Sequence, residues 1–183
     1  MLRGVGRAGL FTVAVLATAT IAACSQTIGG TAQRDNSVQP APARNYGYAD
    51  DRCGLLDDAS VQEILGANDI TRPYSGAVCQ YIASRRQGMT EATIDVTFSW
   101  FDTGSADRER DLAEARGAVV TDIVSEQHEG FSARRDVSGA ACSATAAAGT
   151  GVVSWWVQFP GQATGDPCGD AEKLLLATLR SEM

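Results

Sequence analysis

The sequence predicts an α+β domain: a mainly antiparallel sheet with helices packed on a face and two disulfides, preceded by a signal peptide and a disordered tether. Three observations predict it. Candidate strands follow one another across short turns, which favours antiparallel pairing. Helical segments with recognisable start signals lie at the beginning, middle and end of the domain. Four cysteines remain after residue 51 in a chain whose start is typical of export, which favours disulfides.

Residues 1–23 have the pattern of a cleaved signal peptide. Two arginines precede an apolar run over 8–21, which has the length of a signal-peptide core. A retained membrane helix would need about 20 apolar residues, and a buried core helix would not explain how the run ends. Residues 21–24 read Ile-Ala-Ala-Cys, which is typical of a lipobox. We therefore expect Cys24 to be acylated, to become the N-terminus, and to hold the protein on the extracytoplasmic side of the cell membrane.

Residues 24–51 are expected to form a lipid-anchored, disordered linker, and residues 52–183 a single extracytoplasmic domain. The linker is rich in Ser, Gln, Thr, Gly, Asn, Pro and Ala and has no helical or strand period. Such a segment cannot bury enough apolar surface to offset its ordering entropy. As a flexible coil of about 27 residues it would span on the order of 30 Å, which clears the lipid headgroups.

The chain is acidic, with 15 Lys and Arg against 22 Asp and Glu. Arg3 and Arg7 would leave with the signal peptide, so 13 basic residues would remain against 22 acidic ones, a net charge of −9. That sign argues against nucleic acid as a partner, since phosphates need a basic surface. It also argues against adsorption to anionic lipid by charge alone, so the expected membrane contact is the acyl anchor.

With Cys24 acylated, four cysteines remain: Cys53, Cys79, Cys142 and Cys168. No CxxC pair occurs and the single histidine has no thiol near it in sequence, so we expect no metal site. Four cysteines allow three pairings. We favour the sequential one, Cys53–Cys79 and Cys142–Cys168, in which each bond closes a loop of about 25 residues and contributes roughly 3 kcal/mol.

The first half of the domain predicts two helices and two strands. Residues 57–66 predict a short helix, because N-cap candidates precede apolar residues at helical spacing and a glycine ends them. Residues 76–83 predict a strand. Residues 93–101 are the clearest strand, since apolar and polar side chains alternate along them. Residues 106–116 predict a helix whose charges, such as Arg110 four residues before an acid, indicate an exposed face.

The second half predicts four strands and a last helix. Residues 119–125 and 131–135 read as strands around a polar turn. Residues 140–147 and 152–159 predict a hairpin across a Gly-Thr-Gly turn. Asp166-Pro167 is a good helix start, with a cap residue followed by proline. The expected order is therefore α-β-β-α-β-β-β-β-α.

Little in the sequence indicates catalysis, and we expect no catalytic residues and no cofactor. His128 lies in a polar turn and is expected to be an exposed loop residue. No nucleophile elbow and no phosphate loop occur. The adjacent acids Asp50-Asp51 and Asp57-Asp58 are of a kind that is usually structural. A cell-wall hydrolase that uses a carboxylate pair remains the alternative, since its two acids can lie far apart in the sequence.

Two aromatic residues are candidates for ligand binding. In the strand 152–159 the apolar residues alternate, so Trp156 must point to the face opposite the core. Phe101 stands on the polar face of its own strand. These two side chains either line an apolar groove or lie under a helix.

Several short motifs point to a known lipoprotein family: Ile28-Gly29-Gly30-Thr31-Ala32, Phe98-Ser99-Trp100-Phe101, Gly104-Ser105, Glu109-Arg110, Gly151-Val152-Val153-Ser154-Trp155-Trp156-Val157 and Cys168-Gly169. Through them the sequence resembles the mycobacterial LprB/LprC-type lipoproteins over nearly its whole length. One departure is at 79–81, where Cys-Gln-Tyr replaces the Cys-x-Trp that is frequent in the family. The resemblance implies an actinobacterial cell-envelope lipoprotein and implies no activity.

Taken together, these features favour a non-catalytic envelope module that binds a lipid, a glycan or a protein. The hydrolase and a purely structural envelope protein are the alternatives. A binding module predicts an apolar groove beside Trp156, whereas a hydrolase predicts acids that converge in a cleft.

Overall fold

The computed structural model describes residues 46–125, 128–136, 139–161 and 165–181. The predicted signal peptide, Cys24 and the predicted linker as far as residue 45 lie outside the described residues. Within the described ranges, no helix has the length and apolarity that crossing a bilayer requires.

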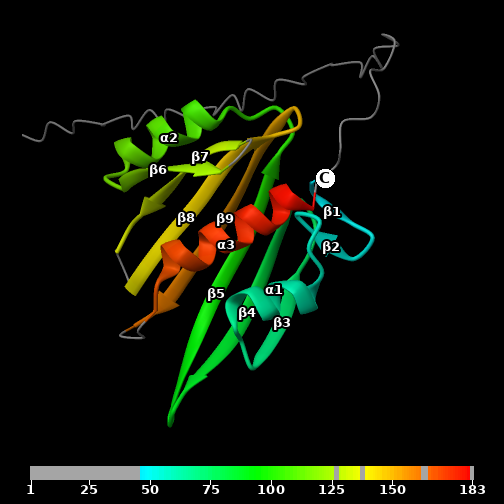
Figure 1. Ribbon diagram of the computed structural model, residues 1–183, viewed down its shortest axis with the longest axis vertical. Coiled ribbons are helices and arrows are strands. Elements are labelled where there is room, and N and C mark those ends of the chain that lie inside the picture. Colours follow the sequence, from blue (N-terminus) through cyan, green and yellow to red (C-terminus); the bar gives the residue numbers. More distant parts are fainter. Residues whose placement is uncertain (1–45, 126–127, 137–138, 162–164, 182–183) are drawn as a thin grey trace, which may run out of the picture. The chain divides into compact units, whose positions relative to one another are not determined.

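Three helices and nine strands make up the described part of the chain (Figure 1). The helices are α1 (Asp58–Leu65), α2 (Ala106–Ala115) and α3 (Pro167–Arg180). The strands are β1 (Tyr48–Ala49), β2 (Arg52–Cys53), β3 (Asp69–Tyr74), β4 (Val78–Gln87), β5 (Thr90–Phe101), β6 (Val119–Ser125), β7 (His128–Arg134), β8 (Gly139–Ala148) and β9 (Gly151–Pro160).

The sheet is antiparallel throughout, as the short turns predict. Seven strands lie in the order β3-β4-β5-β9-β8-β7-β6, and β1 and β2 form a separate two-stranded sheet. Every neighbouring pair in the larger sheet runs antiparallel. The last strand, β9, lies beside β5, so α2 and β6 to β8 are inserted between two sheet neighbours. The α+β fold class is confirmed.

Alternation in the central strands separates the two faces of the sheet. In β9, Trp155, Val157 and Phe159 are fully buried, whereas Trp156 is partly exposed on the opposite face. β5 is in register with β9 so that Phe98 stands beside Trp155, with ring centroids 4.9 Å apart. The first face therefore carries the core.

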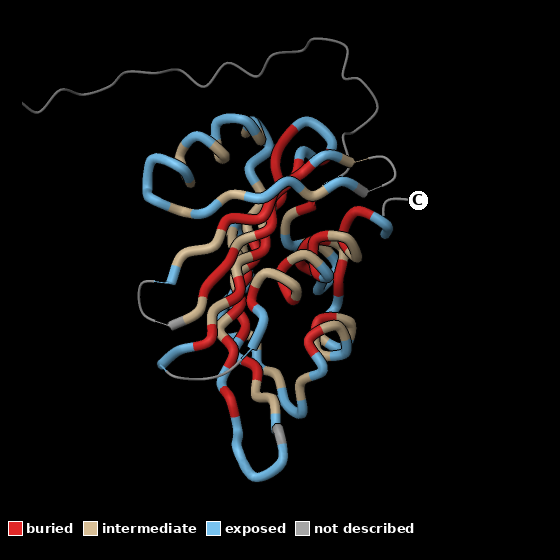
Figure 2. Tube along the Cα trace, turned by 60° about the vertical axis from the view of Figure 1, so that its left-hand side comes forward, coloured by how far each residue is buried: buried red, intermediate tan, exposed pale blue. Residues whose placement is uncertain are grey.

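Helices α1 and α3 cover this core face, and α3 packs on β8 and β9 (Figure 2). The carboxylate of Asp166 caps α3 by accepting a hydrogen bond from the N–H of Gly169, and Pro167 occupies the first turn, as predicted. Nε1 of Trp155 donates a hydrogen bond of 2.9 Å to Oγ1 of Thr178, so the buried indole N–H is satisfied by the helix above it.

Helix α2 lies on the other side of the sheet, where Figure 2 shows only exposed and half-buried residues along it. It packs against β6, β7 and β8, and none of its residues is buried. A helix that buries so little gains little from tertiary packing, the usual main source of helix stability. The second face of the sheet is therefore only lightly covered.

Both favoured disulfides are present. Cys53–Cys79 joins β2 to β4, and Cys142–Cys168 joins β8 to the first turn of α3; each spans 26 residues of sequence. The first bond attaches the N-terminal segment to the sheet, and the second attaches the last helix to it.

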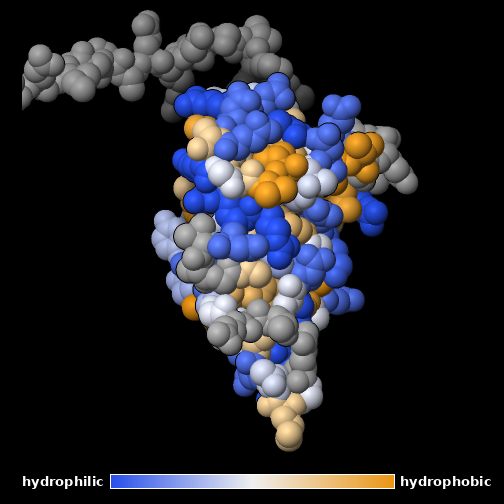
Figure 3. All heavy atoms as spheres, turned by 90° about the vertical axis from the view of Figure 1, so that its left-hand side faces the viewer, coloured by the Kyte–Doolittle hydropathy of each residue, from blue (hydrophilic) through white to orange (hydrophobic). Residues whose placement is uncertain are grey.

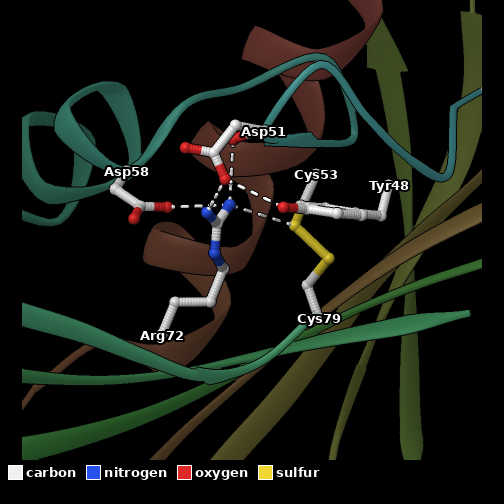
Figure 4. Close-up of a disulfide and its surroundings, with 6 residues drawn as sticks. All are labelled: Tyr48, Asp51, Cys53, Asp58, Arg72 and Cys79. Atoms are coloured by element: carbon white, nitrogen blue, oxygen red, sulfur yellow. Dashed lines mark hydrogen bonds and ion pairs between the residues drawn. A yellow bond between two sulfur atoms is a disulfide. The ribbon is translucent and has the colours of Figure 1, made fainter. Parts of the chain in front are cut away.

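The ordered domain begins before residue 52, the boundary expected from composition. Tyr46 is fully buried and its ring lies 6.3 Å from that of Trp100. Arg72 reaches from β3 to hold this segment: it is ion-paired with Asp51 and with Asp58 at 3.1 Å (Figure 4). Ring burial and charge pairing thus order residues that are polar on average.

Three strands were not predicted. β1 and β2 have two residues each, too few to show a period. β3 contains Pro73, which argues against a central strand; the structure places it at the edge of the sheet with a register irregularity between Thr71 and Tyr74. The expectation that His128 is an exposed loop residue is wrong, because His128 is half-buried and is the first residue of β7, paired with Ser125.

Candidate functional site

A groove of about 210 Å³ lies between α2 and the second face of the sheet. Its floor comes from β5, β9, β8 and β7, and its wall from the last two turns of α2 and the residue after it. The groove exists because α2 covers the β6–β8 half of the sheet while the central strands continue beyond its edge. It therefore runs along the margin of the helix.

Both aromatic candidates line this groove. Thr97 pairs with Trp156 and Phe101 pairs with Val152, so the two aromatics point to the same face from neighbouring strands. Phe101 remains 49% exposed and Trp156 is partly buried. The two expected arrangements, an open groove and cover by a helix, are thus combined: α2 shields one side of the pair and leaves the other open.

Hydroxyl groups surround the aromatic rings on the floor. Ser99, Ser143, Thr145 and Ser154 all line the groove, and Oγ1 of Thr145 lies 2.8 Å from Oγ of Ser154 in a hydrogen bond. Because each hydroxyl can both donate and accept, this floor can hydrogen-bond a ligand beside its apolar rings. The lining therefore suits an amphipathic molecule.

A second cavity, of about 460 Å³, lies at the other end of α2. Phe131 lines both spaces, and the guanidinium of Arg110 stacks over its ring at 4.8 Å. Nη2 of Arg110 also lies 2.8 Å from Oδ1 of Asp122 on β6, so this arginine forms an ion pair with the sheet. The stacked pair therefore separates the two cavities and fastens α2 to the edge of the sheet.

Sequence reasoning missed Phe131 and Arg110 as lining residues. Phe131 was assigned to a strand without a face, and Arg110 was interpreted as a solvated helix residue. The i,i+4 rule pairs a helical arginine with its own helix. Nothing within one helix indicates that Arg110 instead meets Phe131 and Asp122, because those contacts depend on how α2 lies over β6 and β7.

A family model described as a protein of unknown function (DUF3558) matches residues 19–181. The chain belongs to the DUF3558 family. The matched range includes Cys24 and every residue that the structure describes. No curated protein and no solved structure matches the chain. Family membership thus assigns no chemistry to the groove. A function for the groove has to be argued from its lining residues and geometry.

The groups with resolved pKa shifts lie on the core side of this DUF3558 domain, around Arg72. Hydrogen bonds from Tyr48 and then from Arg72 lower the pKa of Asp51, while burial raises the pKa of Asp58. Burial also raises the pKa of Tyr81 to about 12. Figure 4 shows Arg72 between the two acids and beside the Cys53–Cys79 bond, its Nη1 lying 3.7 Å from Sγ of Cys53. This cluster fastens the N-terminal segment.

The adjacent acids found in the sequence have structural partners. Asp57 caps α1 by accepting a hydrogen bond from the N–H of Ser60, and Asp50 is ion-paired with Arg52. Asp51 and Asp58 are held by Arg72, as described above. Within the described ranges, no group of three or more His, Cys, Asp or Glu residues is arranged to hold a metal ion.

The edge strand β6 exposes apolar side chains beside α2. Val119 and Val124 are largely exposed. Figure 3 looks at this side of the molecule and shows apolar atoms set among hydrophilic ones. Isolated exposed valines are common on protein surfaces, so the groove remains the better candidate site.

Proposed function

We propose that this protein is a cell-envelope lipoprotein of the LprB/LprC type that binds an apolar or amphipathic ligand and has no catalytic role. In this proposal, acylated Cys24 holds it on the outer face of the cytoplasmic membrane. The linker then keeps the domain close to the source of such ligands. The ligand lies in the groove between α2 and the sheet.

The observation that supports the binding proposal is that Trp156 and Phe101 line the same groove. Exposure of large aromatic rings to water is unfavourable. Helix α2 covers these two rings only in part. A ligand that filled the groove would bury the remaining ring surface. Ligand sites are typically concavities in which apolar side chains lie beside polar groups that orient the ligand, and this groove has both kinds of lining.

The anchor proposal draws support from the cysteines. The sequence has five cysteines, and the four in the domain form two disulfides with each other, so none of those four can pair with Cys24. A lipobox cysteine with an acylated sulfur accounts for the odd count. Two or three acyl chains are needed for stable attachment, since one chain alone binds a membrane only marginally.

Ligand binding is tested by extracting what the protein carries. The acylated full chain is purified from its native membrane, and its organic extract is compared by mass spectrometry with that of W156A/F101A and of the control Y74A. Tyr74 is an exposed aromatic that does not line the groove. We expect one class of molecule with the wild type and Y74A and its loss from W156A/F101A. Equal extracts from all three would refute the proposal.

Anchoring is tested separately. Cells that express the chain are fed an alkyne analogue of palmitate, and the protein is followed by label and by fractionation. We expect C24S to lose both the label and the membrane association, whereas the neighbouring change S25A keeps both. A wild-type protein that carries no fatty acid would end the anchor proposal.

A further inference from the structure

Two arginines, Arg116 and Arg135, lie at the lining of the groove. Arg116 follows the last residue of α2, and Arg135 follows the last residue of β7; both line the groove. Among the residues that the structure describes, no ion pair joins either guanidinium to a carboxylate, whereas the neighbouring Arg110 and Arg134 each have one. These two positive charges are therefore available to a ligand.

The fold brings the two arginines to the same end of the groove. Two residues connect Arg116 to β6, whose first residue, Val119, is in register with Arg134 on β7. Arg135 is the next residue after that pair. The C-terminal end of α2 and the end of β7 thus lie beside each other, and the cationic end of the groove is set by strand register.

Among the residues that the structure describes, the acid that lines the groove lies away from this end. Glu109 lines the groove from the first half of α2, seven residues before Arg116. At 1.5 Å per residue, the two positions are about 10 Å apart along the helix axis. A ligand group between Arg116 and Arg135 is therefore much nearer to two positive charges than to the negative one, in a protein whose net charge is −7.

We propose that the ligand of the groove is a short-chain amphiphile with one anionic group, a carboxylate or a phosphate, held by Arg116 and Arg135. This inference rests on the proposed binding function and deepens it. The apolar part lies on Trp156 and Phe101, while guanidinium groups suit carboxylates and phosphates because they donate two parallel hydrogen bonds. The groove, at about 210 Å³, is smaller than most drug-sized sites, which favours a single short chain.

The experiment measures the anion preference of the acylated full chain in phosphatidylcholine nanodiscs by titration calorimetry, with empty nanodiscs as the blank. The probes are octanoate, octyl phosphate, octanol and inorganic phosphate. The variants are R116Q/R135Q, the control R86Q/R180Q, and W156A/F101A. Arg86 and Arg180 are exposed and do not line the groove, so the control changes net charge equally.

For the wild type and R86Q/R180Q we expect at least one of the two octyl anions to bind about tenfold more tightly than octanol, since a guanidinium forms stronger hydrogen bonds with an anionic group than with a neutral hydroxyl. R116Q/R135Q should bind all three octyl probes equally. Octanoate and octyl phosphate distinguish the carboxylate from the phosphate. Inorganic phosphate should bind far more weakly than octyl phosphate.

Four outcomes overturn the inference. The first is octanol binding as tightly as both anions, and the second is an anion preference that survives in R116Q/R135Q. The third is equal loss of the preference in R86Q/R180Q. The fourth is inorganic phosphate binding as tightly as octyl phosphate, which would make the site one for a bare anion. Octanol binding that is lost in W156A/F101A, without any anion preference, leaves the binding function standing; no binding of any octyl probe removes both.

Discussion

Nη2 of Arg85 lies 2.8 Å from Oδ2 of Asp170, in an ion pair that joins β4 to α3. The Asp170 side chain is only 5% exposed and that of Arg85 17%. The same guanidinium donates to the backbone carbonyl of Leu65, at the end of α1. One arginine therefore connects both core helices to the sheet.

We expect D170N to lower the free energy of unfolding by about 3 kcal/mol, because it leaves the Arg85 charge buried without its partner. Urea denaturation of the full chain checks this value. The control is E172Q on the same helix, which should change it by less than about 0.5 kcal/mol. If D170N and E172Q unfold at the same urea concentration, the ion pair is not a structural link.

The hydrogen bond between Trp155 and Thr178 gives a second prediction. T178V keeps the shape of the side chain but leaves the buried indole N–H without an acceptor, which should cost about 1–3 kcal/mol. T178S keeps the hydroxyl and should recover most of that loss. Urea denaturation followed by tryptophan fluorescence measures both variants. Equal destabilisation by T178V and T178S would contradict the prediction, because T178S keeps the hydroxyl that accepts the hydrogen bond and T178V does not.

The two disulfides should stabilise the domain by similar amounts. Each spans 26 residues, and a closed loop of that length is worth about 3–4 kcal/mol in the chain-entropy description. We expect C53A/C79A and C142A/C168A each to lose about that much in urea denaturation. Unfolding the wild type with and without a reducing agent provides the control for cavities left by alanine. A loss below about 1 kcal/mol in either pair would contradict the prediction.

Stability above pH 10 should depend on Tyr81. Burial raises its pKa to about 12 from an ordinary value of 10.0, so the unfolded chain ionises first. The stability linked to this phenol is thus fully present below about pH 10 and is lost as the pH rises through about 12, a change on the order of 2–3 kcal/mol. The difference in unfolding free energy between the wild type and Y81F, measured from pH 8 to 12, should show this fall.

The matched control for that measurement is Y74F, because Tyr74 is an exposed tyrosine outside the core. Its unfolding free energy should follow that of the wild type across the whole range. A phenol at position 81 that ionises near pH 10 in the folded protein, by absorbance near 295 nm, would contradict the burial argument.

The local sequence pattern was enough to predict which side chains lie on each face of the sheet, but not which strands lie next to each other. The alternation around Trp155 placed Trp156 on the outer face, and Asp166-Pro167 marked the start of α3. These features depend on residues a few positions apart. The pairing of β5 with β9 joins residues such as Thr97 and Trp156, 59 positions apart, and no local signal specifies it.

The groove shows the same division. Trp156 and Phe101 could be selected as candidates because each breaks the polarity of its own face. Arg116, Arg135 and Phe131 could not, since their shared position depends on where α2 lies over the sheet. A long-range arrangement of this kind has no periodic signature in the chain.

Because α2 buries none of its own residues, folding places few demands on its sequence apart from Arg110, which fastens the helix to the sheet. Substitutions in α2 can change the side chains that lie over the rings at little cost in stability, as they do in variable loops on a rigid scaffold. Relatives with the same sheet and disulfides could therefore bind different molecules through substitutions at the 10 positions of α2, while the sheet and the disulfides stay unchanged.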